Sequence, residues 1–284
     1  MGLSARPAVV DRVVIALPDE NRLESFRACP GGESFRVFWA VDGRGGRAAE
    51  RFDTNRFVAR VGSPATGGEM GCVLSHLSVV TAFANEVGAD TDLMVVAEDD
   101  ALLGRDFEAV LDRLVRRLRP IGVVVLADPF GAAGRRDFFG ASERWAQLSA
   151  LAVPVGPAHR PLQYRVGRVE GHLMGAGLYL ITRRAARRYA DWAALQGRPH
   201  WVADDYGFWA REARIGVRLV RPNLAGWVGG TQLERPEPGR ATEILREHQR
   251  SGSLLERLRW RLAPRTRLRR LAASLRAARR RDPS

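Results

Sequence analysis

The sequence lacks lysine altogether, holds only two cysteines and contains no long apolar run. All 45 basic residues are therefore arginines, which we interpret as coding bias and not as a recognition device. Cys29 and Cys72 are too few for a disulfide framework and fit a reducing cytosolic setting. No early segment resembles a signal peptide, and no run approaches the roughly 20 apolar residues of a membrane span, so we expect a cytoplasmic protein.

The excess positive charge is concentrated at the C-terminus. Residues 246–284 contain 13 arginines and three acids, a net charge of +10, so the rest of the chain carries only +3 of the total of +13. Because the body shows no basic face in its sequence, specific nucleic-acid binding is not expected. The composition is otherwise ordinary for a globular protein, and 284 residues suffice for a substantial core.

The clearest pattern in the sequence covers residues 66–100. Thr66 followed by Glu69 is a capping-box pattern, and apolar residues then recur every three or four positions, which predicts an amphipathic helix. Residues 93–97 are uniformly apolar, as in a strand covered on both faces. The strand ends in three consecutive acids, Glu98, Asp99 and Asp100. Open α/β sheets bind ligands at this end of their strands, and a divalent cation would relieve the repulsion between the carboxylates.

An alternative is that these acids only precede the next helix, for which Asp106 is the expected cap. The preceding helix favours a functional interpretation. It carries the block Gly68-Glu69-Met70-Gly71-Cys72-Val73-Leu74-Ser75-His76, and the strand downstream ends in Ala97-Glu98-Asp99-Asp100. This combination resembles glycosyltransferase family 25, whose pattern is Gly-Glu-Ile-Gly-Cys-x-Leu-Ser-His followed by an apolar strand into Glu-Asp-Asp. The family contains bacterial lipooligosaccharide galactosyltransferases and collagen galactosyltransferase domains.

The resemblance implies an α/β, GT-A-like nucleotide-sugar-binding fold with a central, mostly parallel sheet. We expect this domain over residues 8–235 and a basic, weakly amphipathic helical tail over residues 236–284. The implied activity is metal-dependent, inverting transfer of a hexose, with galactose from UDP-galactose as the usual donor, to a glycan hydroxyl such as that of lipooligosaccharide. Two alternatives stay open: another sugar nucleotide in capsule or natural-product assembly, and a noncatalytic binding module with a basic tail.

The N-terminal segment predicts a strand, a helix and a strand at residues 9–17, 19–28 and 35–41, the start of a nucleotide-binding α/β unit. The family has an Asn-Leu-Asp loop, an arginine and a strand ending in Val-Asp-Gly here, and Ala16 replaces the asparagine. The positions that match are Leu17, Asp19, Arg22 and Asp42. The resemblance places them near the nucleotide, whereas a plain turn is the alternative for the Asp-Gly pair.

Further elements follow from the same patterns. We expect helices at 107–118 and 183–195, an edge strand at 164–169, and buried strands at 121–126, 175–182 and 217–222. Residues 44–66 should form a connection with at most one short element, and residues 131–161 are irregular in pattern.

The acids at 98–100 define the predicted metal site. Oxygen ligands suit Mn²⁺ or Mg²⁺, and a cation beside a sugar diphosphate would neutralise the leaving group. Asp100 is the first choice as ligand, and Glu98 would bind the ion or the ribose. The predicted donor-binding residues on this side are Glu69, Ser75, His76, Glu98 and Asp99. For Glu69 the capping box, and for His76 a structural role, are the alternatives; His172 and His200 are candidate third metal ligands.

Asp204 is the candidate catalytic base, because it aligns with an aspartate of the family and an acceptor hydroxyl must lose its proton to a nearby carboxylate. Binding of the acceptor and capping of a helix are equally open for it. In the tail, leucines and Trp260 lie opposite arginines, the pattern of a peripheral membrane anchor. We therefore expect association with an anionic membrane surface at the inner face of the cytoplasmic membrane; a disordered solubilising tail is the alternative.

Overall fold

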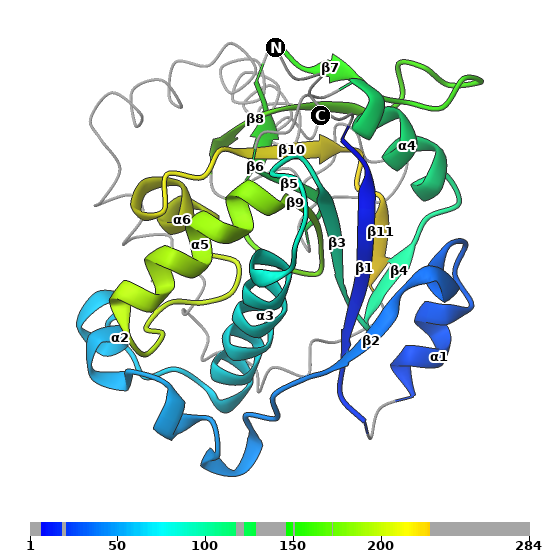
Figure 1. Ribbon diagram of the computed structural model, residues 1–284. Helices are drawn as coiled ribbons and strands as arrows, with labels where there is room; N and C mark the ends of the chain where they lie inside the picture. Colours follow the sequence, from blue (N-terminus) through cyan, green and yellow to red (C-terminus); the bar gives the residue numbers. More distant parts are fainter. Residues whose placement is uncertain are drawn as a thin grey trace, which may run out of the picture. The chain divides into compact units, whose positions relative to one another are not determined.

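The computed structural model describes residues 7–18, 21–117, 122–128, 146–149, 151–171 and 173–227 (Figure 1). All of them belong to the unit Met1–Arg240, one of two into which the chain divides. Asp19, His172 and the predicted tail over residues 236–284 lie outside the described residues. The predicted boundary at residue 235 and the helical or disordered state of the tail stay predictions.

A large sheet organises the described residues. Its nine strands are β1 (Val9–Ala16), β2 (Arg36–Trp39), β3 (Leu93–Glu98), β5 (Val123–Ala127), β6 (Ala146–Leu148), β7 (Val153–Pro154), β8 (Arg165–Gly171), β9 (Leu178–Thr182) and β10 (Val217–Arg221). They lie in the order β2-β1-β3-β9-β5-β10-β8-β6, and β7 pairs with β8. A second, two-stranded sheet joins β4 (Ala101–Leu103) to β11 (Ala225–Trp227).

β9 determines how parallel the large sheet is. It lies between β3 and β5 and runs antiparallel to both, while the pairs β1–β2, β1–β3 and β5–β10 are parallel. Strand β8 also runs against its partners, so five of the eight pairings are antiparallel although seven of the nine strands point the same way. The prediction of a mostly parallel sheet is thus confirmed for strand direction and wrong for the pairings.

The alternation over residues 164–169 had predicted an edge strand, and this prediction is wrong, because β8 has partners on both sides. It pairs with β10 on one side and with β6 and β7 on the other. Alternating apolar residues report that one face of a strand is buried and the other is more exposed, and they do not report whether the strand has two hydrogen-bonded neighbours.

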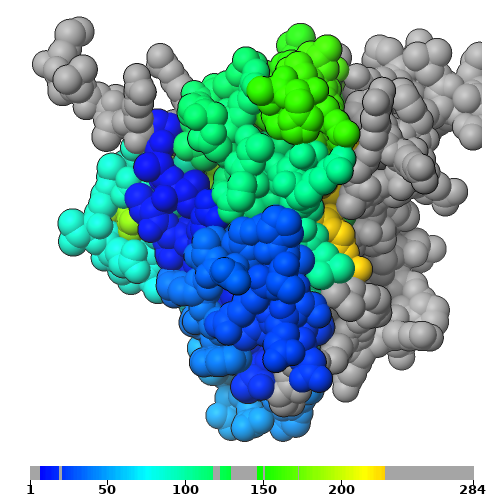
Figure 2. Space-filling view, turned by 90° about the vertical axis from the view of Figure 1, so that its right-hand side faces the viewer, coloured from blue at the N-terminus to red at the C-terminus, as the bar shows by residue number. Residues whose placement is uncertain are grey.

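Helices cover both faces of the large sheet. They are α1 (Arg22–Arg27), α2 (Thr54–Val61), α3 (Gly67–Asn85), α4 (Phe107–Arg117), α5 (Arg183–Gln196) and α6 (Tyr206–Glu212). Helices α3 and α5 pack together on one side of the sheet, and α1 and α4 lie on the other (Figure 1). The apolar residues of α1 and α4 share a buried cluster with alternate residues of β1, β3 and β5. In Figure 2, which looks onto this side, the blue segment with α1 lies below the green segment with α4.

Helix α3 begins as its sequence predicts, and it ends at Asn85. Thr66 accepts a hydrogen bond from the Glu69 amide, and the Glu69 side chain accepts one from the Thr66 amide, which completes the capping box. At the other end, Arg183 donates to the carbonyl oxygens of Phe83 and Glu86, so a buried guanidinium stabilises the helix C-terminus.

Glycines allow the start of α3 to approach the segment after β2. A Cβ atom added to Gly43 would lie 1.7 Å from the carbonyl oxygen of Gly67, and one added to Gly71 would lie 2.5 Å from that of Val41. Only glycine fits at such contacts between backbones. The glycines of the motif therefore bring the helix N-terminus close to the carboxyl end of β2.

Two local predictions are wrong. Residues 44–66 contain α2 and two 3₁₀ turns, η2 (Arg44–Gly46) and η3 (Ala49–Arg51), where we expected at most one short element. Helix α2 buries only Phe57 and Val61, which is too little to give a clear period. Helix α1 has Asn21 at its N-cap, so it begins later than the predicted start at residue 19. None of the helices in the described part of the chain combines the length and the apolar character needed to cross a membrane.

Candidate active site

The three acids after β3 are fixed between two neighbouring strands. The amide of Asp99 donates to the carbonyl oxygen of Ile15 in β1 at 3.1 Å. The amide of Glu98 donates to the carbonyl oxygen of Gly177, just before β9, at 2.9 Å. The acids thus lie where the carboxyl ends of β1 and β3 meet the start of β9.

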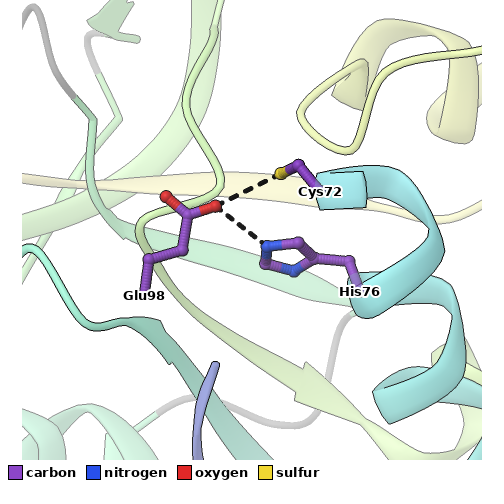
Figure 3. Close-up of side chains that lie close together, drawn as sticks. All are labelled: Cys72, His76 and Glu98. Carbon is purple, nitrogen blue, oxygen red and sulfur yellow. Dashed lines mark hydrogen bonds and ion pairs between the residues drawn. The ribbon is translucent and has the colours of Figure 1, made fainter. Parts of the chain in front are cut away.

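Glu98 faces helix α3. One of its oxygens, Oε1, lies 3.1 Å from Nε2 of His76 and accepts a hydrogen bond of 3.3 Å from the Cys72 thiol (Figure 3). Figure 3 also shows its second oxygen pointing away from both residues. Burial alone would raise the pKa of Glu98, but the hydrogen bonds to His76 and Cys72 and the charge of Arg22 outweigh burial, so that the pKa is lowered.

Asp99 and Asp100 face helix α1. Arg22 lies 3.3 Å from Oδ1 of Asp99 and 3.5 Å from Oδ2 of Asp100. Burial and the charges of Glu98 and Asp99 together raise the pKa of Asp100 to about 7. The charge of Arg22 opposes this shift. The other oxygen of Asp100, Oδ1, is buried and has no hydrogen-bond partner among the described residues.

The three acids contact different residues, but they lie close enough to interact, since the charges of Glu98 and Asp99 raise the pKa of Asp100. Glu98 bonds to residues of α3, whereas Asp99 and Asp100 pair with Arg22. Within the described residues, the side chains that lie close enough to hold a metal ion together are Cys72, His76 and Glu98, whose ligand atoms lie within 4.8 Å of one another. The predicted metal ligands Asp100 and Glu98 have different contacts, and their joint binding of an ion stays a prediction.

Asp204 lies beside the same end of the sheet. Its Oδ2 accepts a hydrogen bond of 2.6 Å from the amide of Gly175, which lies two residues before Gly177. Burial raises the pKa of Asp204 to about 6, although the hydrogen bond from Gly175 opposes the shift. The cap of α6 is instead Asp205, which accepts from the Phe208 amide. Capping is thus excluded for Asp204, and the roles of base and acceptor binder stay open.

The electrostatics of Cys72 show that the carboxylates share one site. Burial raises the pKa of its thiol well above the ordinary value. Three nearby carboxylates raise it further: Glu98, Asp204 and Asp100. The thiol of Cys72 is also a hydrogen-bond donor to Glu98.

Several predicted donor-binding residues have structural partners. Ser75 is fully buried, accepts from the Val41 amide at 2.8 Å and donates to the Gly71 carbonyl, so it joins α3 to the segment after β2. Glu69 belongs to the capping box. Asp42 accepts from the amide and side chain of Arg44, which is the turn that we named as its alternative.

Other predicted residues lie elsewhere. Leu17 is half-buried just after β1, and no polar contact defines a role for it. His200 packs against the rings of Trp201 and Phe208, and burial lowers its pKa. The structure does not bring His200 into the group with Glu98.

Sequence reasoning missed Tyr179, which is the second residue of β9 and whose hydroxyl contacts Nδ1 of His76 at 3.0 Å. A buried apolar strand gives no sign that one of its members is used for its hydroxyl. The spacing of Cys72 and His76, four residues apart on one helix, could have indicated that both side chains face the same neighbour.

A second polar network occupies the carboxyl ends of β5 and β10. Arg221, which is 3% exposed, forms an ion pair with Asp128, which is 2% exposed. Asn223 accepts from Arg221 at 2.8 Å and donates to the carbonyl of Asp128 at 2.7 Å. This network balances its charges internally.

These features define a class of protein. A mixed α/β sheet with carboxylates at the carboxyl ends of its parallel strands fits a GT-A-like, nucleotide-binding enzyme. The model of glycosyltransferase family 25, described as LPS biosynthesis protein, matches residues 12–196. The match covers more than half of the chain, and the chain therefore belongs to glycosyltransferase family 25. A comparison with curated proteins gives no match.

The family match confirms the resemblance seen in the sequence and identifies the chain as a glycosyltransferase, with a sugar donor and a glycan acceptor. It includes Arg22, the glycine-rich start of α3 and the acids after β3. It ends within α5, before Asp204, so the role of Asp204 depends on the geometry alone.

Proposed function

We propose that this glycosyltransferase is a metal-dependent, inverting hexosyltransferase that moves galactose from UDP-galactose to a hydroxyl of a glycan such as lipooligosaccharide. The observation that supports this activity best is a pair of carboxyl groups, Asp100 and Asp204, near one end of the sheet, with pKa values of about 7 and about 6. Perturbed carboxyl groups in one site are typical of residues that bind cations or transfer protons.

A divalent cation fits beside Asp100. The buried Oδ1 of this residue has no hydrogen-bond partner in the described part of the chain, and Arg22 only partly compensates the neighbouring carboxylates. Oxygen ligands of this kind suit Mn²⁺ or Mg²⁺, and Glu98 would contribute the oxygen that points away from α3. When bound, the ion would act as a Lewis acid that neutralises the departing diphosphate.

Asp204 is proposed as the general base. The acceptor oxygen would attack the anomeric carbon as the bond from that carbon to the diphosphate breaks, and Asp204 would take the hydroxyl proton. A base works best when its pKa lies near the working pH, and the raised pKa of Asp204 meets this condition. The hydrogen bond from the Gly175 amide holds one oxygen of Asp204 in place and leaves the other for the acceptor.

A panel of UDP-sugars, incubated with the protein, an acceptor mixture and Mn²⁺, tests the proposal. We expect UDP release with UDP-galactose, its loss with EDTA and its recovery on adding Mn²⁺. We expect Asp204→Asn to lower turnover by about 10²- to 10⁴-fold. Turnover that survives EDTA would disprove the metal dependence. Preference for another sugar nucleotide would support the alternative of transfer in capsule or natural-product assembly.

We further propose that the arginine-rich segment at residues 236–284 associates with anionic membranes, because each basic residue near such a surface contributes about 1 kcal/mol. Sedimentation with vesicles of anionic or neutral lipids, at low and high salt, tests this. Binding that requires anionic lipid and weakens with salt is expected. Equal sedimentation with neutral vesicles would contradict the electrostatic basis.

A further inference from the structure

A buried chain of polar groups leads from the core to the candidate active site. Tyr179 and His76 are both 0% exposed, and their side chains meet through the Tyr179 hydroxyl and Nδ1 of His76 at 3.0 Å. The other ring nitrogen, Nε2, lies 3.1 Å from Oε1 of Glu98. This row of hydrogen-bonded groups thus ends at Glu98, whose side chain is 27% exposed.

The hydrogen bonds among Tyr179, His76 and Glu98 indicate which of their atoms donate and which accept. Burial raises the pKa of Tyr179 well above its ordinary value, so its hydroxyl keeps its proton. A buried hydroxyl requires an acceptor, and the only one that the described residues offer it is Nδ1 of His76. In this arrangement the Tyr179 hydroxyl donates to Nδ1 and Nε2 donates to Glu98.

The consequence for Glu98 is that its two oxygens become different. Oε1 receives two donors, from His76 and Cys72, both on helix α3. The second oxygen points away from that helix, as Figure 3 shows. Helix α3 is itself fixed by its capping box and by the glycine contacts with the segment after β2. The carboxylate of Glu98 is therefore held in one orientation relative to α3.

We propose that His76, oriented by Tyr179, is a positioning residue that holds one oxygen of Glu98 on helix α3 and presents the other to the sugar-nucleotide side of the site. His76 itself does not touch the substrate. This inference depends on the proposed function, since the donor or its cation is what the presented oxygen would meet. It replaces our prediction from sequence that His76 contacts the donor directly.

Matched variants of His76 test the role. The amide nitrogen of glutamine can reach the place of Nε2, whereas that of asparagine ends near Nδ1. We expect His76→Asn to lower kcat/KM for the donor by about 10- to 100-fold, the range found when groups that orient a ligand are removed. His76→Gln should retain activity within about fivefold, because it restores the donor to Glu98. The KM of the acceptor should not change in either variant.

His159→Asn is the control, since His159 is 63% exposed and lies outside the site. A merely structural role would lower the thermal stability of both His76 variants and leave the kcat/KM of the folded fraction unchanged. Equal losses of kcat/KM in His76→Gln and His76→Asn, at equal folded fractions, would overturn the proposal.

A second measurement does not require turnover. With ¹⁵N-labelled histidine in the full chain, the ring of His76 can be assigned by its loss in His76→Asn, because the chain has only five histidines. We expect the Nε2-protonated tautomer, and we expect Tyr179→Phe to shift the ring toward a mixture. An Nδ1-protonated ring, or one zinc ion per chain bound at Cys72, His76 and Glu98, would contradict the proposal. If no sugar nucleotide is turned over by the wild type, the proposed function fails while this measurement still decides the geometry.

Discussion

Two polar clusters lie at the carboxyl ends of parallel strands, and they differ in how their charges are balanced. After β5 and β10, Asp128 and Arg221 are paired, and Asn223 bonds to both. After β3, Arg22 forms ion pairs with two acids, Asp99 at 3.3 Å and Asp100 at 3.5 Å. An oxygen of Asp100 is left buried without a hydrogen bond among the described residues, and the pKa of this acid is raised to about 7.

This difference in charge balance suggests that the first cluster stabilises the fold and the second binds a ligand, although both lie at the same edge of the sheet. In the first cluster each charge has an opposite partner, although Nε of Arg221 has no hydrogen-bond partner among the described residues. Removing one partner of such a pair exposes the other to the full cost of burial. An acid whose environment disfavours its charge is maintained at the expense of stability, which is typical of a site that binds a ligand. We therefore expect substitutions in the first cluster to change folding and those in the second to change activity.

Asp100→Asn should have the largest effect. Stabilisation by a cation contributes several kcal/mol, and each 1.36 kcal/mol is a factor of ten in rate, so we expect turnover to fall by about 10³-fold. The free energy of unfolding should change by no more than about 1 kcal/mol, because Asp99 remains as a partner for Arg22. Turnover at saturating Mn²⁺ and chemical denaturation measure the two quantities. A large loss of stability with unchanged turnover would reverse the assignment of the two clusters.

Asp128→Asn should show the opposite pattern. It leaves the buried guanidinium of Arg221 without its anionic partner, so we expect the free energy of unfolding to fall by about 3 to 5 kcal/mol. Turnover per folded molecule should change little. The matched control is the double variant Asp128→Leu, Arg221→Met, which removes both charges and should be more stable than the single variant. A double variant that is as unstable as Asp128→Asn would show that the charge pair is not the cause.

The pH profile extends the comparison to Asp204. A base must be ionised to accept a proton, and the pKa of Asp204 is raised to about 6. At saturating Mn²⁺, which would keep Asp100 ionised, we therefore expect kcat/KM to be constant above this pH and to fall about tenfold per pH unit below it. The measurement needs a parallel check that the protein stays folded at low pH. An unchanged profile in the residual activity of Asp204→Asn would assign the inflection to another group.

Much of the fold follows from local patterns in the sequence. The capping box and apolar period gave α3 its predicted start, and the apolar runs at β3, β5, β9 and β10 are strands. Their order in the sheet did not follow, because the placement of β9 between β3 and β5 depends on contacts between residues far apart in the chain. Helix α2 was missed because only one narrow side of it is buried.

The site could be located from the sequence but not resolved. The motif on α3 and the acids after β3 indicated the correct family, and the structure brings them together at one edge of the sheet. The sequence could not show that Glu98 bonds to α3 while Asp99 and Asp100 pair with Arg22, since that depends on the direction of each side chain. It also could not distinguish Asp204 from Asp205, two adjacent acids of which one caps α6 and the other accepts from Gly175.

Glu69→Gln should have the smallest effect, because Glu69 resembles Asp128 in being satisfied by the fold. Its carboxylate accepts from the Thr66 amide at 2.7 Å, and glutamine keeps an acceptor there. We expect turnover within about twofold of the wild type, whereas Thr66→Ala should lower the free energy of unfolding by about 1 kcal/mol through loss of the cap. Denaturation curves and donor KM values measured on both variants check this. A tenfold rise in the donor KM of Glu69→Gln at unchanged stability would instead place Glu69 in contact with the donor, as its position in the sequence motif had predicted.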